Sequence, residues 1–288
     1  MSLAGNAMER YYAFAGVELC IRLPENQLQE AEHRLAPFRV DAVASPHCFR
    51  FVFREKLPQP RGSLCAKTDS MMVYRDGDIQ IRYLGPVEEP YIRVEYQGRE
   101  HCVQLLEKSF TGAVGTRTVL GAIGAEHLVV EAGGVILHCS YIDIGGKAIL
   151  FTAPSGTGKS TQAELWKQLR SAEIINGDRA AMRFADGKTW AMGIPFAGSS
   201  PYCENRTMPL AAIVCLGQAK KTTIRRLTGF AAFRRVWEGC SVNSWDRADM
   251  EQASATVSKI LNQVPVFALD CTPDESAVIA LEQAMQEV

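Results

Sequence analysis

A short glycine-rich segment, placed between an apolar run and an amphipathic stretch, is the feature that most constrains how this chain can fold. Residues 148–161 read Ala-Ile-Leu-Phe-Thr-Ala-Pro-Ser-Gly-Thr-Gly-Lys-Ser-Thr. Residues 148–152 are typical of a buried strand. Residues 161–170 have helical apolar spacing, which predicts that Leu165, Trp166 and Leu169 pack inward. A strand joined to a helix by such a loop is the arrangement of a Walker A phosphate loop, here in the form A-x-x-x-x-G-K-S.

The residue types in this loop each have a physical role. Backbone N–H groups of the turn converge on phosphates, and Gly156 and Gly158 allow the positive φ and close approach that this requires. The helix that follows points the positive end of its dipole at the same anion. Lys159 should reach the β- and γ-phosphates, and the Ser160 hydroxyl should bind Mg²⁺. We therefore expect ATP or another nucleoside triphosphate to bind Pro154, Ser155, Gly156, Thr157, Gly158, Lys159, Ser160 and Thr161.

A triphosphate–Mg²⁺ site also needs a carboxylate from a neighbouring strand. Asp178 is the best candidate, because it ends the short run 173–178 that follows the loop helix. We expect it to bind Mg²⁺ together with Ser160; the alternative is that it only caps a turn with Gly177. His138 lies on an apolar strand before the loop strand, where a histidine is more often a satisfied core residue than a catalyst.

The chain has two parts with different hydrophobic periodicity. Residues 1–115 alternate apolar and polar side chains in short runs, and the Asp-Gly pair at residues 76–77 is a hairpin signal. This part is predicted to be a β-rich domain, interrupted by one helix at residues 25–34. It contains no acid, base or phosphate-binding constellation, so we expect it to recognise the substrate or to support assembly. Residues 116–288 mix strands and helices and are predicted to form a P-loop nucleotide-binding domain.

The second part is predicted to contain the following elements, in addition to the loop strand and helix. The pattern gives helices at residues 120–130, around 250–264 and at the chain end, where Thr272 should cap the last helix and Pro273 should begin it. It gives strands at residues 135–139, 141–144, 173–175, 180–184, 189–192 and 266–269, and a strand pair at 211–216 and 223–227.

Residues 137–160 resemble the catalytic core of the HPr kinase/phosphorylase family. That family has a histidine on a strand, a small hairpin, and a strand leading into a G-x-S-G-x-G-K-S loop, which His138, Gly145-Gly146 and the loop match here. The resemblance extends to the nucleotide-binding core of ATP-dependent phosphoenolpyruvate carboxykinases. It implies an α/β (α+β) fold whose mixed sheet carries the loop at its edge. It also implies catalytic roles for His138 and Lys159, and for Asp178 in binding the metal and deprotonating the acceptor.

Several positions depart from the family pattern. Ala153 replaces the first loop glycine, the paired acids appear as Gly177-Asp178, and the downstream Glu-Ile-Arg-Gly-Leu-Gly signature is missing. Residues 192–200 stand where a substrate-facing loop is expected. We therefore expect an ATP- and Mg²⁺-dependent kinase whose acceptor is a Ser or Thr hydroxyl of a peptide or protein. The alternatives are a kinase of a small-molecule hydroxyl and a non-catalytic nucleotide sensor.

Composition excludes several other classes of protein. The formal net charge is −1 and no basic stripe is present, so nucleic acid is not an expected partner. The nine cysteines include no C-x-x-C pair, which argues against a disulfide framework or a zinc site of the usual spacing. No apolar run approaches the ~20 residues needed to span a bilayer, and the start lacks a signal-peptide pattern. We expect a cytoplasmic protein without a membrane partner, and the sequence leaves formation of a homo-oligomer open.

Overall fold

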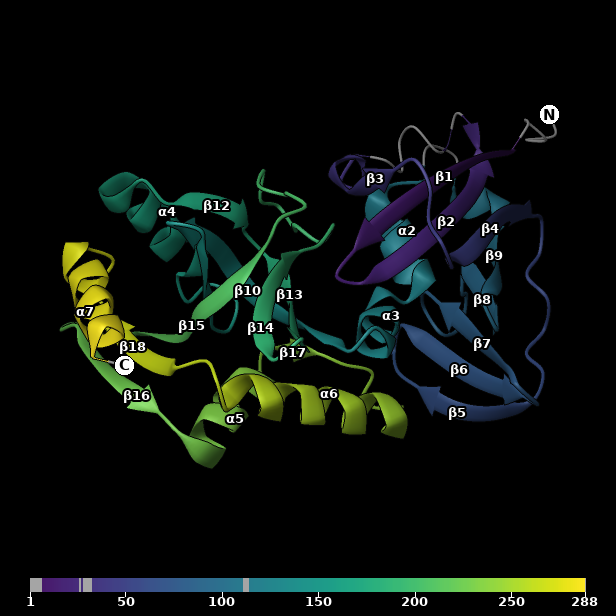
Figure 1. Ribbon diagram of the computed structural model, residues 1–288. Helices are drawn as coiled ribbons and strands as arrows, with labels where there is room; N and C mark the ends of the chain where they lie inside the picture. The colour runs from purple at the N-terminus through teal and green to yellow at the C-terminus, as the bar shows by residue number, and fades with distance from the viewer. Residues whose placement is uncertain (1–6, 26, 28–32, 111–113, 288) are drawn as a thin grey trace. The chain divides into compact units, whose positions relative to one another are not determined.

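The structure is a computed structural model that describes residues 7–25, 27, 33–110 and 114–287 (Figure 1). Most of the helix predicted at residues 25–34 lies outside the described residues. The chain separates into two compact units. Residues up to Ala125, except Phe14–Gly16, form the first, and Glu126–Val288 together with Phe14–Gly16 form the second.

The first unit is built on one nine-stranded mixed sheet with the order β3-β1-β2-β4-β9-β8-β7-β6-β5. Its strands are β1 (Ala7–Phe14), β2 (Val17–Pro24), β3 (Arg39–Val40), β4 (His47–Arg54), β5 (Ser63–Lys67), β6 (Met71–Asp76), β7 (Ile79–Leu84), β8 (Ile92–Gln97) and β9 (Glu100–Leu106). The hairpin predicted between β6 and β7 is present, and Gly77 has the positive φ, 60°, that its turn needs. Helix α2 (Thr116–Ile123) packs near β8, where the Tyr96 hydroxyl donates to the carbonyl of Ala122 at 2.7 Å.

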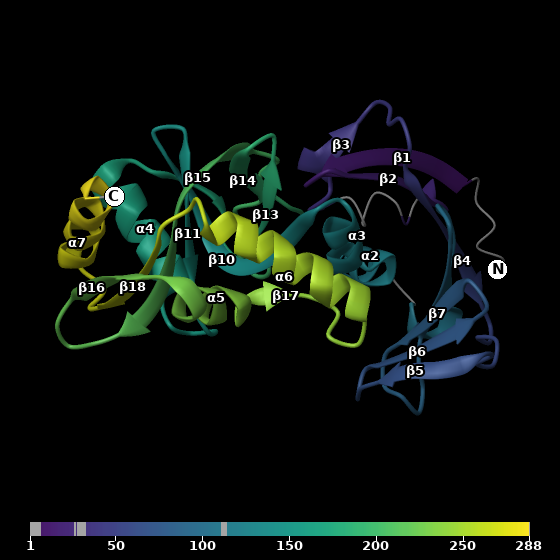
Figure 2. The same cartoon turned by 60° about the horizontal axis from the view of Figure 1, so that its bottom comes forward.

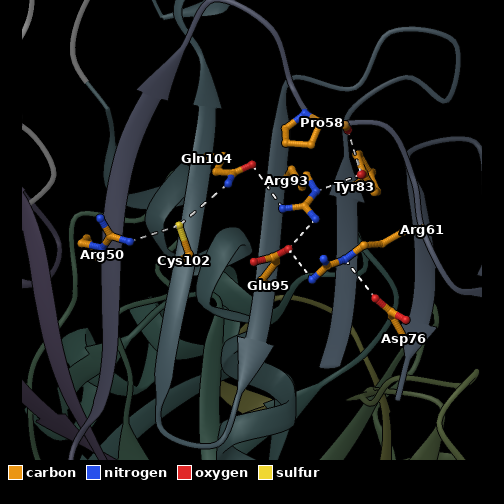
Figure 3. A network of polar contacts seen from close by, with 9 residues as sticks. All are labelled: Arg50, Pro58, Arg61, Asp76, Tyr83, Arg93, Glu95, Cys102 and Gln104. Atoms are coloured by element: carbon orange, nitrogen blue, oxygen red, sulfur yellow. Dashed lines mark hydrogen bonds and ion pairs between the residues drawn. The ribbon is translucent and has the colours of Figure 1, made fainter. Parts of the chain in front are cut away.

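One face of this sheet carries a connected set of polar side chains (Figure 3). Arg93 on β8 is only 2% exposed, and its guanidinium donates to Tyr83, Gln104 and Glu95 at 2.9, 3.2 and 2.5 Å. The carboxylate of Glu95 also pairs with Arg61 at 3.2 Å. Because a buried guanidinium is costly without partners, this network explains how the sheet accommodates Arg93.

The second unit contains two sheet regions that share the long strands β10 (Gly134–Ile144) and β15 (Thr207–Gln218). The amino-terminal half of β10 pairs with β13 (Arg179–Ala185), which continues through β14 (Lys188–Gly193) to the start of β15. The other half of β10 pairs with β11 (Lys147–Thr152) and β12 (Glu173–Asn176). From β11 the sheet continues in parallel to β15 and β18 (Val266–Cys271), and ends on the antiparallel β16 (Thr223–Leu227).

Two pairs of helices enclose this sheet, one pair on each face (Figures 1 and 2). Helices α5 (Gly229–Trp237) and α6 (Arg247–Leu261) contact each other and pack on the face that includes Leu150 and Ile213. Helices α4 (Lys159–Arg170) and α7 (Glu275–Gln286) pack on the face that includes Phe151. Successive side chains of the central strands point to opposite faces of the sheet, so they pack into two hydrophobic cores, as expected for strands that are buried on both faces.

Several element predictions in this part were wrong. The single helix at residues 120–130 is two helices, α2 and α3 (Ala125–Glu131), because Gly124 has a left-handed φ of 63° and ends the first. The two strands at 135–139 and 141–144 are one strand, β10. Strands β15 and β16 are not neighbours, since β18 lies between them. Helix α5 and the short strand β17 (Cys240–Ser241) were not predicted.

Two side-chain predictions were also wrong. The cap of α7 is Asp274, whose carboxylate accepts from the Ser276 N–H at 2.9 Å, and Thr272 instead donates to Asp274. Leu169 of α4 is 37% exposed, whereas Trp166 is buried as expected. In the described part of the chain, no helix combines the length and apolar character that crossing a membrane requires.

Candidate functional site

The glycine-rich loop leaves the carboxyl end of β11 and enters α4. The family resemblance implied that the loop lies at the edge of the sheet. Strand β11 is instead hydrogen-bonded to β10 on one side and to β15 on the other, so the loop starts from an interior strand. Gly156 and Gly158 have φ values of 78° and 120°, which a residue with a side chain adopts only with strain. The first turn of α4 begins at Lys159, directly after the loop, so its free N–H groups lie at the loop.

Lys159 is folded onto the loop from which it extends. Its Nζ donates to the carbonyl oxygens of Ala153 at 2.9 Å and Pro154 at 3.2 Å, and the residue is 8% exposed. Burial lowers the pKa of this ammonium group, with Asp178 acting in the opposite direction. Because its hydrogen bonds are to neutral carbonyls, and no carboxylate of the described residues is hydrogen-bonded to it, the ammonium retains attraction for a phosphate.

A cavity of about 410 Å³ opens beside the loop. Its volume is in the range of small-molecule sites. It brings together the loop and the start of α4, the middle of β10, β12 with the residues that follow it, and the segment between β14 and β15. Of the residues predicted to bind nucleotide or metal, it is lined by Ser155, Gly156, Gly158, Lys159, Ser160, Thr161 and Asp178, and His138, which was predicted to be catalytic, lines it as well. Pro154 lines a neighbouring cavity, and Thr157 lines neither.

Asp178 lies close to His138, which also lines this cavity, and to Arg179, which lines the neighbouring one. Its Oδ1 lies 3.5 Å from His138 Nε2, and its Oδ2 lies 3.4 Å from Arg179 Nε. The hydrogen bond from His138 is the main cause that lowers the pKa of the Asp178 carboxyl; Arg179 and Lys159 add to it, and burial opposes it. The carboxylate is therefore ionised at neutral pH and able to accept a proton or a metal ion.

Asn176 fixes the backbone that carries Asp178, and sequence reasoning missed it. The side chain is fully buried, and its Oδ1 accepts from the N–H groups of Asp178 and Arg179 at 2.9 and 3.0 Å. Its Nδ2 donates to the Ile194 carbonyl at 3.0 Å. The Asn-Gly-Asp sequence was a signal for such a side-chain-to-backbone turn.

Gly177 stands at the position of the second acid in the family resemblance, and the structure gives a reason for the glycine. A Cβ placed on Gly177 would lie 2.2 Å from the Oγ of Ser200. The segment between β14 and β15 thus occupies the space that a side chain at position 177 would need. This packing excludes an acidic side chain at position 177, so Asp178 is the one of the two adjacent positions that carries a carboxylate.

The same segment forms the far end of the cavity. Tyr202 donates its hydroxyl to Glu164 of α4 at 3.0 Å and accepts from Lys167 at 2.8 Å. Ser199, Ser200 and Tyr202 line the cavity. The first two belong to residues 192–200, the segment expected to face a substrate, so the end of that segment borders the cavity. Sequence reasoning did not identify Tyr202, because its partners on α4 are distant in the sequence.

The donor chemistry of the cavity fits a hard divalent cation held partly by phosphate. The described part of the chain contains no cluster of three or more His, Cys, Asp or Glu side chains that could hold a metal ion by itself. The Ser160 hydroxyl and the Asp178 carboxylate both line the cavity, and both are oxygen donors of the kind that Mg²⁺ prefers. A site of this type is completed by nucleotide phosphates and water, so few protein ligands are required.

Comparisons with known proteins give a distant structural likeness. No protein-family model matches the chain, and no curated protein matches it. Among solved structures, the chain is similar to the Hpr(Ser) kinase/phosphatase from Coxiella burnetii, with 11% sequence identity and a TM-score of 0.32. The match covers 53% of this chain and 88% of the other. A likeness this distant does not establish a function for this chain.

Proposed function

We propose that this chain is an ATP- and Mg²⁺-dependent kinase that transfers a γ-phosphoryl group to a hydroxyl, with a Ser or Thr of a peptide or protein as the acceptor. The observation that carries the proposal is the shared cavity. It combines a phosphate loop, the Lys159 that belongs to the loop, and the ionised carboxylate of Asp178. A phosphate loop alone supports binding, whereas a carboxylate in the same cavity supports transfer.

The roles of the residues follow from their chemistry. The loop N–H groups, the start of α4 and Lys159 hold the triphosphate and offset negative charge on the transferring phosphoryl group. Mg²⁺ held by Ser160 and Asp178 would supply further charge neutralisation. Asp178 orients the acceptor hydroxyl and receives its proton as the new oxygen–phosphorus bond forms and the bond to the β-phosphate oxygen breaks. His138 lies 3.5 Å from the carboxylate and keeps it ionised and oriented.

Nucleotide binding and phosphoryl release test this proposal separately. Calorimetric titration with ATP–Mg²⁺ measures binding. Single-turnover release of labelled phosphate, to water or to an added Ser peptide, measures chemistry. We expect wild-type protein to show both, and Asp178→Asn to keep binding while losing most of the chemistry.

Asp186→Asn is the matched control for removal of a carboxylate. Asp186 lies on the β13–β14 turn, is exposed, and lines neither of the two cavities described here; its φ of 52° is also tolerated by Asn. Absence of ATP binding by the wild-type protein would refute the proposal. Binding without any phosphoryl release would leave a nucleotide sensor as the function.

A further inference from the structure

A second cavity of about 340 Å³ opens at the start of the phosphate loop. It is bordered by the first residues of the loop, Ala153 and Pro154, by the end of α5 and by β17. His138 lines both cavities. The α5 and β17 residues of the second cavity do not line the first cavity.

Hydrogen bonds connect residues that line the second cavity to β11, the strand that leads into the phosphate loop. The His138 N–H donates to the carbonyl of Gly239 at 2.8 Å, and the Thr152 hydroxyl donates to the carbonyl of His138 at 2.9 Å. A Cβ on Gly239 would lie 2.6 Å from Thr152 Oγ1, so the α5–β17 turn and the end of β11 are in close contact. A ligand in this cavity would therefore be held at a fixed position relative to the loop.

The charges that line the second cavity are two arginines and one glutamate. Cys215 and Cys240 are neutral at physiological pH, because burial raises the pKa of their thiols to about 11 and about 12. Arg179 is already matched by carboxylates, with Asp178 at 3.4 Å and Glu126 at 3.6 Å.

Arg235 differs from Arg179 in having a single long ion pair. Its Nη1 lies 3.8 Å from Glu238 Oε2, which is beyond hydrogen-bonding distance, and the two side chains are 36% and 55% exposed. Within the described residues, no other ion pair or hydrogen bond of the Arg235 side chain is recorded. Most of its donors are thus available to a ligand, and the exposed outer wall lets that ligand extend beyond the cavity.

We propose that this second cavity binds the acceptor as a peptide segment, with Arg235 holding the carboxylate of an acidic residue close to the Ser or Thr. The proposal rests on the kinase function proposed above and names its substrate class. Phosphoryl transfer requires the attacking and leaving oxygens to be roughly in line. Nucleotide in the first cavity and peptide in the second would meet at His138, which lines both cavities, with the Asp178 carboxylate 3.5 Å from that histidine. A cavity whose outer wall, formed by Arg235 and Glu238, is partly exposed and carries one available guanidinium suits an acidic peptide that extends past the wall.

Oriented Ser peptide libraries test this directly. Glu or Lys is fixed in turn at each of three positions on either side of the Ser, and labelled phosphoryl transfer is measured for each library. The readout is the Glu-to-Lys ratio of rates for one enzyme, so a general loss of activity cancels. We expect wild-type protein to favour Glu by about tenfold at one position or more, the size of a single half-exposed charge-assisted contact.

Three variants separate Arg235 from its surroundings. Arg235→Glu should remove or reverse the preference, and Arg235→Lys should retain part of it because the charge is kept. Arg234→Glu is the matched control on the same helix: Arg234 is 65% exposed, lies outside the cavity and should leave the ratio unchanged.

The outcomes are distinguishable from those of the proposed function. The inference is wrong if wild-type protein shows no preference for Glu, or if Arg235→Glu and Arg234→Glu alter the ratio equally. It is also wrong if ATP binds and is hydrolysed but no peptide is labelled, a result that leaves the phosphoryl chemistry standing. Failure of the wild-type protein to bind ATP would remove the proposed function itself.

Discussion

Arg93 in the first unit and Asp178 in the second are both charged side chains in a sheet framework, but their surroundings differ. Arg93 is 2% exposed and donates to three side chains at 3.2 Å or less. The Asp178 side chain is 27% exposed, borders a cavity, and meets its two nearest partners at 3.4 and 3.5 Å. A charge whose partners are close and complete stabilises the fold, whereas a charge with long contacts at a cavity can exchange them for a ligand. We therefore expect substitution of Arg93 to lower stability and substitution of Asp178 to lower phosphoryl transfer.

The largest expected effect is that of Lys159→Ala. The ammonium is the one charged group of the loop, so its removal should abolish turnover and weaken ATP–Mg²⁺ binding by about 10- to 100-fold. Calorimetric titration and single-turnover assays measure both effects. Far-ultraviolet circular dichroism should be unchanged. Normal ATP affinity together with normal turnover would show that the loop does not bind phosphate.

Asp178→Asn should reduce phosphoryl transfer by about 10²–10⁴-fold, because the carboxylate is the proposed base and the amide keeps only its shape. ATP should still bind, though less tightly if Asp178 also holds Mg²⁺. His138→Ala should cost less than Asp178→Asn, since the histidine supports the carboxylate without replacing it. Rapid-quench measurement of a single turnover compares the two. Equal losses in both variants would mean that the histidine, and not only the carboxylate, carries the chemistry.

Arg93→Met should lower the free energy of unfolding by about 2–3 kcal/mol, because hydrogen bonds to a buried charge are lost and their partners remain. Nucleotide binding should not change. Arg50→Met is the matched control on the same face of the sheet (Figure 3), since Arg50 is exposed and, among the residues that the structure describes, its one side-chain contact of this kind is with Cys102 Sγ at 4.0 Å. It should change stability by less than about 0.5 kcal/mol. Urea denaturation measures both, and a loss of ATP binding in Arg93→Met would overturn the contrast between the two regions.

The smallest expected effect is a pH dependence of stability due to Asp178. Its pKa is lower in the folded protein than the ordinary value of 3.8, so the carboxylate stabilises the fold fully above that value. The contribution is lost as the pH falls through the lower folded pKa. The difference in unfolding free energy between wild type and Asp178→Asn should therefore shrink between about pH 6 and pH values below the ordinary pKa. A difference that grows on acidification would contradict the direction of the shift.

Local patterns predicted much of the fold. The alternation of apolar and polar residues and the turn residues located most strands, because the buried face of a strand and the glycine of a hairpin can be recognised from residues that are close in the sequence. Strand partners are not local, which is why β16 was paired with β15 when it pairs with β18. Helix α5 was missed because it is short and begins at Gly229, a poor helix former.

The candidate site divides in the same way. The structure brings Lys159, Asp178 and His138 to one cavity, and these residues stand out in the sequence by type and spacing. Asn176 and Tyr202 did not stand out, because their contacts with Ile194 and Glu164 join segments that only the fold brings together. The second cavity depends on the end of α5, a helix that the sequence pattern did not predict.

The packing of Ser200 against Gly177 has a consequence for how this site can evolve. An acid at position 177 would collide with Ser200, so that substitution is unfavourable by itself. Removing the Ser200 side chain first would open the space, but it would also remove the Oγ that accepts from the Tyr202 N–H at 3.2 Å. Each single step carries a cost that the double change Gly177→Asp with Ser200→Gly partly cancels. The effects of substitutions at positions 177 and 200 are therefore expected to be coupled, so that a second acid is accessible only through a paired change.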